Sequence, residues 1–194
     1  MTGWHWRCAC CEGGAAGGRR GLLRGALGLA ASAALAAPAA AQLIAGGGPR
    51  RLLIERMQTN ETFDGIYWRD GRYDREALSQ LNWVFRDPSR GEATPMDPRL
   101  FDLLHTMAAR LDATEGFQVI SGYRSPETNA ARARQSRRVS SASLHMSGMA
   151  ADVRLPGRDS MALARLAAEM QVGGVGLYRR DGFVHLDCGP ARRW

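Results

Sequence analysis

Apolar residues recur every three or four positions in several stretches of the chain, which is the spacing of an amphipathic helix. Asp74 and Asp159 each precede such a stretch and are placed to cap a helix. Asp97 and Pro98 open the stretch with the clearest stripe, formed by Leu100, Leu103, Leu104, Met107 and Leu111. The pattern predicts four helices, over residues 74–85, 97–111, 126–134 and 159–170.

Short extended stretches lie before, between and after these helices, and several of them end in turn residues such as Asn60-Glu61 and Asp70-Gly71. A hairpin turn at residues 179–182 joins the last two of them. Two of the helices precede most of the later short strands, and hairpins join several strands, which indicates an α+β fold with a small, mostly antiparallel sheet and flanking helices rather than a doubly wound sheet. The predicted strands cover residues 51–58, 62–69, 117–120, 149–155, 173–178 and 182–187.

The N-terminal segment has the three parts of an export signal. Arg19-Arg20 precedes an apolar stretch at residues 25–37, and Ala39-Ala40-Ala41 supplies a small-residue cleavage pattern. The stretch is shorter than the roughly 20 residues that span a bilayer, although a retained N-terminal anchor is the alternative. The paired arginines favour the twin-arginine export machinery as a partner. We therefore predict a signal at residues 1–41, a linker at 42–49 and a periplasmic domain at 50–194, with no stable membrane anchor after cleavage.

The net charge of the whole chain is +7 over 194 residues, with a pI near 10.0, and every basic residue is arginine. The lack of lysine excludes Schiff-base catalysis and a phosphate-binding P-loop. The predicted signal holds four arginines and one glutamate, so the remainder has 22 arginines against 18 acidic residues, or +4. That is an ordinary solvated surface, and no basic segment interleaved with aromatic residues accompanies it. We expect no nucleic-acid partner.

Two short segments combine a histidine with a nearby carboxylate. His145 and Asp152 flank Gly148, which allows the chain between them to bend sharply. His185 and Asp187 alternate along a predicted strand, so both side chains face the same side. Two histidines and one carboxylate leave an open coordination position, as in catalytic zinc sites. A simple hydrogen-bonded pair of Asp152 and His185 is the alternative.

Residues 143–152 read S-x-H-x-x-G-x-A-x-D, which resembles the first metal motif of the M15 zinc peptidases. Residues 121–125, S-G-Y-R-S, are similar to a second segment of that family. The ending at residues 173–194 resembles its twin-arginine-exported, murein endopeptidase branch. The resemblance covers residues 50–194 and implies the hedgehog-like fold of the DD-peptidases. It also implies a zinc-dependent hydrolase that cuts amide bonds in peptidoglycan stem peptides or cross-links, as an endopeptidase or a carboxypeptidase.

The resemblance assigns roles to individual residues. It implies that His145, Asp152 and His185 are the zinc ligands. Arg124 would lie by the cleft and bind a substrate carboxylate or stabilise the oxyanion, and Ser143 would orient the site. Manganese or iron is not excluded, because a site with two histidines and one carboxylate also suits them.

The sequence departs from the family at the general base. Many M15 enzymes carry a glutamate three residues before the last histidine, and here that position is Gly182. The available carboxylates are Asp187, on the same strand face as His185, and Asp181 in the turn. Asp187 either accepts the proton or fixes the orientation of His185. If no base is present, a non-catalytic, metal-containing module that binds peptidoglycan is the alternative function.

Overall fold

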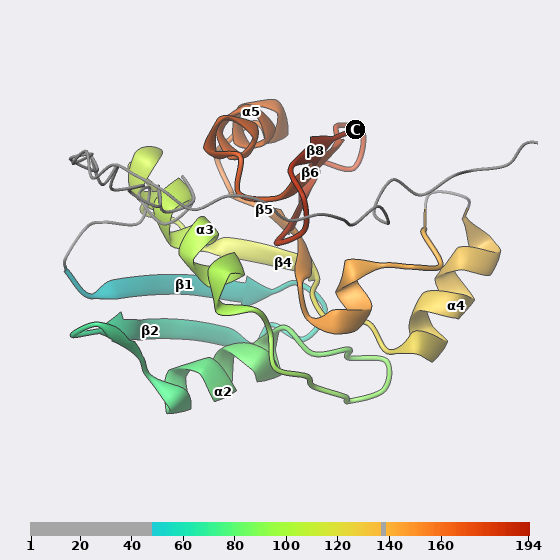
Figure 1. The fold of residues 1–194 in the computed structure, drawn as a ribbon, viewed down its shortest axis with the longest axis horizontal. Helices are drawn as coiled ribbons and strands as arrows, with labels where there is room; N and C mark the ends of the chain where they lie inside the picture. The colour runs from blue at the N-terminus through green and yellow to red at the C-terminus, as the bar shows by residue number, and fades with distance from the viewer. Residues whose placement is uncertain (1–47, 137–138) are drawn as a thin grey trace, which may run out of the picture. The chain divides into compact units, whose positions relative to one another are not determined.

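The structure is a computed structural model that describes residues 48–136 and 139–194. The predicted export signal and residues 42–47 of the predicted linker lie outside the described residues. The described part contains four α-helices and one eight-stranded sheet in the order β3-β2-β1-β4-β5-β7-β6-β8 (Figure 1). Only the β1–β4 and β6–β8 pairs are parallel, so the predicted α+β class with a mostly antiparallel sheet is confirmed. No helix within the described ranges is long and apolar enough to cross a membrane.

The strands follow the predicted alternation closely. Two strands that the sequence pattern did not predict, β3 and β8, have only two residues each. The strands are β1 (Arg50–Arg56), β2 (Thr62–Arg69), β3 (Arg72–Tyr73), β4 (Phe117–Ser121), β5 (Ala150–Arg154), β6 (Gly174–Tyr178), β7 (Phe183–Asp187) and β8 (Arg192–Arg193).

The helices begin where the capping residues predict. The Asp74 and Asp97 carboxylates and the Ser125 hydroxyl accept hydrogen bonds from backbone N–H groups of the first helical turns. Asp159 takes the corresponding position, but its side chain makes no capping bond. The helices are α2 (Arg75–Val84), α3 (Pro98–Arg110), α4 (Pro126–Gln135) and α5 (Ser160–Met170), with a short 3₁₀ turn, η1 (Leu144–Ser147).

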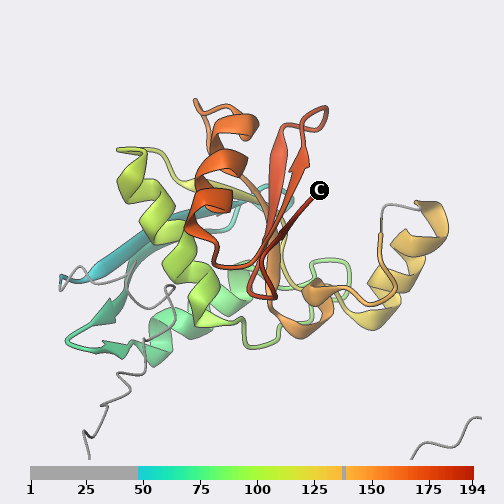
Figure 2. The same cartoon turned by 45° about the horizontal axis from the view of Figure 1, so that its top comes forward.

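Helices α2, α3 and α5 cover one face of the sheet, and α4 lies to one side (Figures 1 and 2). Along β1 the buried Leu52 and Ile54 face these helices, whereas Leu53 points to the opposite face and is 41% exposed. Val153 and Val184 pair across β5 and β7 and belong to the same core. Side chains alternate along a strand, so the neighbours of these valines point away from the helices. The two predicted ligands on the sheet therefore lie on the face opposite the core.

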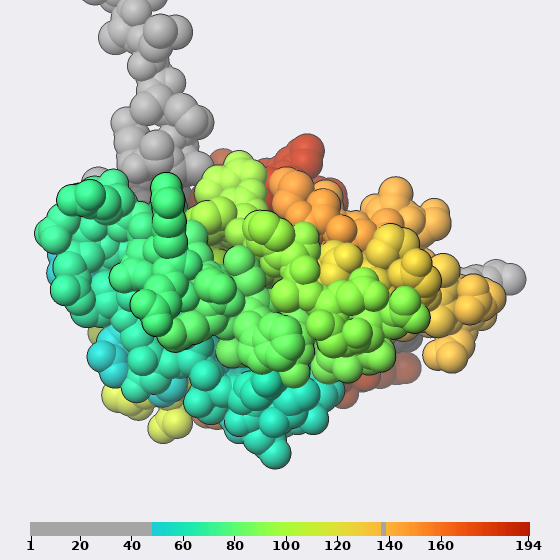
Figure 3. Space-filling view, turned by 90° about the horizontal axis from the view of Figure 1, so that it is seen from below, coloured from blue at the N-terminus to red at the C-terminus, as the bar shows by residue number. Residues whose placement is uncertain are grey.

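The segment that joins α2 to α3, residues 86–97, lies beside α2 on the surface shown in Figure 3. It also contacts the turn that follows η1. Gly148 has a φ of 69°, and a Cβ there would lie 2.5 Å from the carbonyl oxygen of Pro95. The Asp97 N–H donates to the Gly148 carbonyl at 2.9 Å. Glycine is therefore needed at 148 for both its conformation and its close packing, and these contacts hold the end of η1.

A buried carboxylate on α3 joins the first strands to the helix layer. Asp102 accepts hydrogen bonds from Arg50 Nη1 at 2.6 Å, Tyr67 Oη at 2.9 Å and Tyr73 Oη at 2.5 Å. We expect Asp102→Ala to lower the free energy of unfolding by about 3–5 kcal/mol, because it leaves the buried Arg50 charge without this partner. Urea unfolding measures the change. Asp64→Ala is the matched control, because it removes an exposed ion pair with Arg51; a loss as small as in this control would contradict the prediction.

Candidate metal centre

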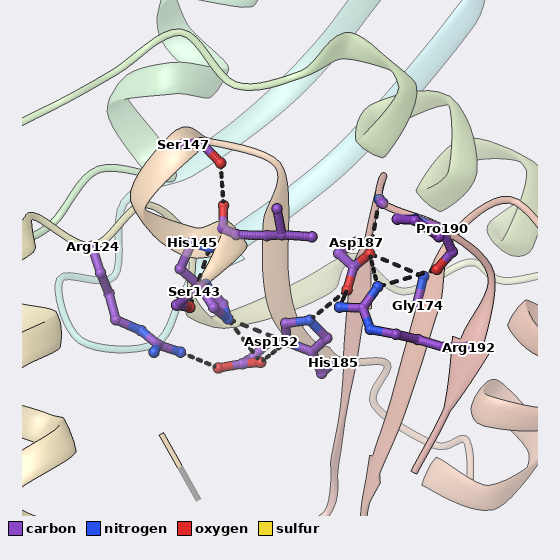
Figure 4. Close-up of polar contacts among 12 residues, drawn as sticks. Arg124, Ser143, His145, Ser147, Asp152, Gly174, His185, Asp187, Pro190 and Arg192 are labelled. Carbon is purple, nitrogen blue, oxygen red and sulfur yellow. Dashed lines mark hydrogen bonds and ion pairs between the residues drawn. The ribbon is translucent and has the colours of Figure 1, made fainter. Parts of the chain in front are cut away.

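Three buried side chains from η1, β5 and β7 converge at one point (Figure 4). His145 Nε2 lies 3.2 Å from His185 Nδ1 and 3.3 Å from Asp152 Oδ1. His185 Nδ1 and Asp152 Oδ1 are 2.9 Å apart. Ligand atoms around a tetrahedral zinc ion, with bonds of about 2.0–2.1 Å, lie about 3.3 Å from one another. The donor types and their spacing therefore fit zinc.

Local structure explains how residues far apart in the sequence meet here. In the β5–β7 ladder Asp152 lies directly opposite His185, so the two side chains share the face away from the core. Ser143 precedes η1, and its hydroxyl accepts a hydrogen bond from the His145 N–H. The left-handed Gly148 then returns the chain to β5. Turn and strand together bring His145 over the ladder.

The ring nitrogen of His145 that points away from the cluster is hydrogen-bonded to a backbone carbonyl. His145 Nδ1 lies 2.7 Å from the Gly122 oxygen, and since a carbonyl only accepts, Nδ1 carries the proton. Burial lowers the pKa of His145, which favours the neutral ring. The Nε2 lone pair is therefore directed at the cluster. A side chain on Gly122 would collide with the carbonyl of Phe85, so the close approach of this carbonyl requires glycine.

The outward nitrogen of His185 donates instead to a carboxylate. His185 Nε2 lies 3.1 Å from Asp187 Oδ2, on the edge of the ring away from the cluster, which leaves Nδ1 to face His145 and Asp152. Burial opposes the charged ring, but the hydrogen bonds with Asp152 and Asp187 outweigh it and raise the pKa of His185. In the charged ring Nδ1 carries a proton. A cation at the cluster competes with this proton for Nδ1, so binding of a cation releases the proton.

Asp187 is fully buried and receives hydrogen bonds from several directions. The backbone N–H groups of Gly174 and Gly189 donate to Oδ1 at 3.0 and 2.8 Å. Arg192 donates to both carboxylate oxygens, at 3.1 and 2.7 Å. Burial alone would raise the pKa of Asp187, but these bonds and the one from His185 hold it well below its usual range. Asp187 is thus a carboxylate anion behind His185.

Arg124 lies next to Asp152, the third predicted ligand. Its Nη2 donates to Asp152 Oδ2 at 3.0 Å, and the same guanidinium donates to Ser121 Oγ at 3.0 Å and Asn129 Oδ1 at 3.3 Å. Burial of Asp152 would raise its pKa, but the two histidines hold the pKa far below its usual range. With Oδ2 bound to Arg124, Oδ1 faces the histidines.

A pocket of about 400 Å³ opens onto the cluster. Arg124, Ser143 and both histidines line it, together with Tyr178 and Trp194. The described residues that line the pocket include no aspartate or glutamate. All six residues singled out from the sequence therefore come together: Arg124, Ser143, His145, Asp152, His185 and Asp187.

Sequence reasoning missed three neighbours of the site: the Gly122 carbonyl, Arg192 and Trp194. Two glycines on β6, Gly174 and Gly176, could have indicated that Arg192 and Trp194 pack against this strand. A Cβ at Gly174 would lie 2.6 Å from Arg192 Nη1, and one at Gly176 would lie 2.6 Å from the Trp194 ring. Two glycines at alternate positions of a strand indicate a close approach on one face. The pattern does not say which side chains make that approach.

Comparison with known proteins identifies the family. The sequence model of the peptidase M15_2 family, described as peptidoglycan L,D-endopeptidase MepK, matches residues 44–194. The peptidoglycan L,D-endopeptidase MepK of Escherichia coli strain K12 is 40% identical over 147 residues, or 75% of this chain and 80% of the relative. The probable peptidoglycan L,D-endopeptidase MepK of Haemophilus influenzae is 35% identical over 147 residues, or 75% and 79%. No solved structure matches the chain. The chain belongs to the M15 peptidases, in the MepK family.

Proposed function

We propose that the protein is a zinc-dependent endopeptidase of the periplasm that hydrolyses L,D amide bonds in peptidoglycan peptides. The observation that carries the zinc site is the convergence of His145, Asp152 and His185 at the spacing of tetrahedral ligands beside an open pocket. The names of the relatives support an endopeptidase over a carboxypeptidase and supply the bond class. The predicted export signal supports the periplasm.

The chain supplies a prepared donor set for this chemistry. Bound zinc lowers the pKa of a coordinated water to about 7 and polarises a carbonyl oxygen. His145 and His185 each have one nitrogen fixed by a partner behind the ring, the Gly122 carbonyl and the Asp187 carboxylate. Such partners set the tautomer and orientation of ligating histidines. The ligand nitrogens of the two histidines are therefore oriented toward the cluster before a cation or substrate binds.

We assign Asp187 to positioning rather than to proton transfer. It contacts the Nε2 edge of His185, whereas the cluster lies at the Nδ1 edge. It is fully buried and surrounded by donors from Gly174, Gly189 and Arg192. A general base must come within hydrogen-bond reach of the proton that it accepts. A carboxylate behind the ring acts through His185 instead.

Arg124 has two roles in this proposal. Three of the five N–H groups of a guanidinium are taken by Ser121, Asn129 and Asp152, which anchors it and holds the ligand carboxylate. The remaining two belong to a side chain that lines the pocket. We propose that they donate to a substrate carboxylate or to the oxyanion that forms as the amide is attacked.

Mass spectrometry of a muropeptide digest tests the proposed function. Zinc-loaded protein comprising residues 42–194 is expected to convert cross-linked muropeptides into fragments with new termini at an L,D bond. If the digest released only single D-amino acids, the protein would be a carboxypeptidase, and the proposed endopeptidase activity would be wrong. Tight binding to sacculi with no new fragments would identify a binding module and contradict the proposal.

A further inference from the structure

Trp194 is a large aromatic residue at the edge of the pocket. Its ring centroid lies 5.2 Å from that of His185, and the residue lines the same pocket as the two histidines. His185 is 8% exposed, whereas Trp194 is 53% exposed. About half of Trp194 thus remains accessible, and the residue lies beside the predicted reaction centre.

The backbone and the neighbouring strand hold Trp194 in place. Its N–H donates to the Val175 carbonyl at 3.2 Å, and its own carbonyl accepts from the Leu177 N–H at 3.0 Å, so it continues the β8 pairing with β6. The ring lies over Gly176, which is paired with His185 in the sheet. Because Gly176 has no side chain, the indole sits close to the β6 backbone.

Arg192 connects the ring to the interior of the site. Its guanidinium carbon lies 5.1 Å from the Trp194 ring centroid, and the same guanidinium binds both oxygens of Asp187 (Figure 4). The indole thus has neighbours on β6 and at Arg192 as well as His185. These contacts position the ring next to the proposed metal ligands.

Trp83, another half-exposed tryptophan, provides a comparison for the contacts of the Trp194 ring. It is 50% exposed, but its Nε1 donates to Glu61 and the Arg86 guanidinium lies 4.0 Å above the ring. The Trp194 indole N–H has no hydrogen-bond partner among residues 48–136 and 139–194. Trp83 therefore has local partners outside the pocket, and it serves as a matched comparison.

We propose that Trp194 binds the substrate: the part of its ring that lines the pocket packs on the aliphatic part of the peptide residue next to the amide that is cut. The inference rests on the proposed peptidase function and extends it to a residue that determines substrate binding. Since the ring is adjacent to His185, the substrate atoms that reach it adjoin the scissile bond and belong to peptide rather than to sugar. Leu144, also in the pocket wall, supplies a second apolar surface.

Steady-state kinetics on a cross-linked muropeptide test the role of Trp194. We expect Trp194→Ala to raise KM about tenfold and to leave kcat within about twofold, because the lost contact forms before the reaction. Trp194→Phe, which keeps a smaller aromatic face, is expected to stay within about threefold of wild type in KM. Trp83→Ala, which removes an indole that does not line the pocket, should not change either constant.

The absorption spectrum of the cobalt-substituted protein reports the arrangement of the groups around the metal. It therefore distinguishes a Trp194 that binds substrate from a Trp194 that holds His185 in position. An unchanged spectrum in Trp194→Ala, together with the raised KM, supports the inference. A KM equal to wild type would overturn it, and so would an altered spectrum with the loss confined to kcat, which would make Trp194 a support for His185. A wild-type protein without hydrolytic activity would instead overturn the proposed function itself.

Discussion

His145→Ala is expected to lower kcat/KM by about 10³–10⁴-fold or more, since it removes one of the three proposed ligands, and a catalytic cation contributes several kcal/mol to transition-state stabilisation. The metal content of the purified variant should fall with the activity. Steady-state kinetics and elemental analysis of the same preparation measure both effects. The loss is expected to be this large because His145 Nε2 is directed at Asp152 and His185 by its bond to Gly122.

His105→Ala is the matched control for this experiment. His105 lies on α3, and its Nδ1 contacts the Arg51 carbonyl at 3.0 Å, away from the cluster. Its loss should leave activity and metal content near those of wild type. If His145→Ala kept wild-type turnover with a full complement of metal, the assignment of His145 as a ligand would be wrong.

Asp187→Asn is expected to weaken zinc binding about 10–100-fold, the usual effect of removing a partner behind a ligating histidine. Saturating zinc should then restore most of kcat, because the positioning role acts through His185. Competition with a calibrated chelator measures the affinity, and kinetics at full occupancy measure kcat. Asp181→Asn, in the exposed turn between β6 and β7, is the control.

The same variant distinguishes positioning from proton transfer. A general base contributes about 10²–10⁴-fold to the rate without holding the cation. An Asp187→Asn protein that binds zinc as tightly as wild type but loses kcat by that factor would reassign Asp187 as the base. The buried position of Asp187 and its bonds to Gly174, Gly189 and Arg192 predict the opposite outcome.

Much of the fold could be predicted from the sequence because local patterns encode it. Helix starts at Asp74 and Asp97 follow from capping chemistry, and the longer strands follow from alternation. Strands β3 and β8 were missed because two residues carry no period. Pairing order is also non-local: nothing in the pattern of β1 indicates that it lies parallel to β4. The predicted hedgehog-like relationship and the export signal stay predictions.

For the candidate site too, features encoded by local sequence could be predicted, whereas contacts between distant residues could not. The ligand types and the shared face of His185 and Asp187 followed from motif and strand geometry. The nitrogen that each histidine directs at the cluster did not, because it depends on Gly122 and Asp187 as partners in space. Arg192 and Trp194 were missed for the same reason: their contacts pass across β6 through the space that Gly174 and Gly176 leave.

Zinc titration of the metal-free protein, with muropeptide hydrolysis as the readout, tests the central claim most directly. Because His145, Asp152 and His185 form a single cluster, the rate should rise in proportion to added zinc and level off at about one zinc per chain. The same titration of His145→Ala should remain flat. Full activity in the metal-free protein, or a rate that does not respond to zinc, would contradict the assignment of this cluster as a catalytic metal site.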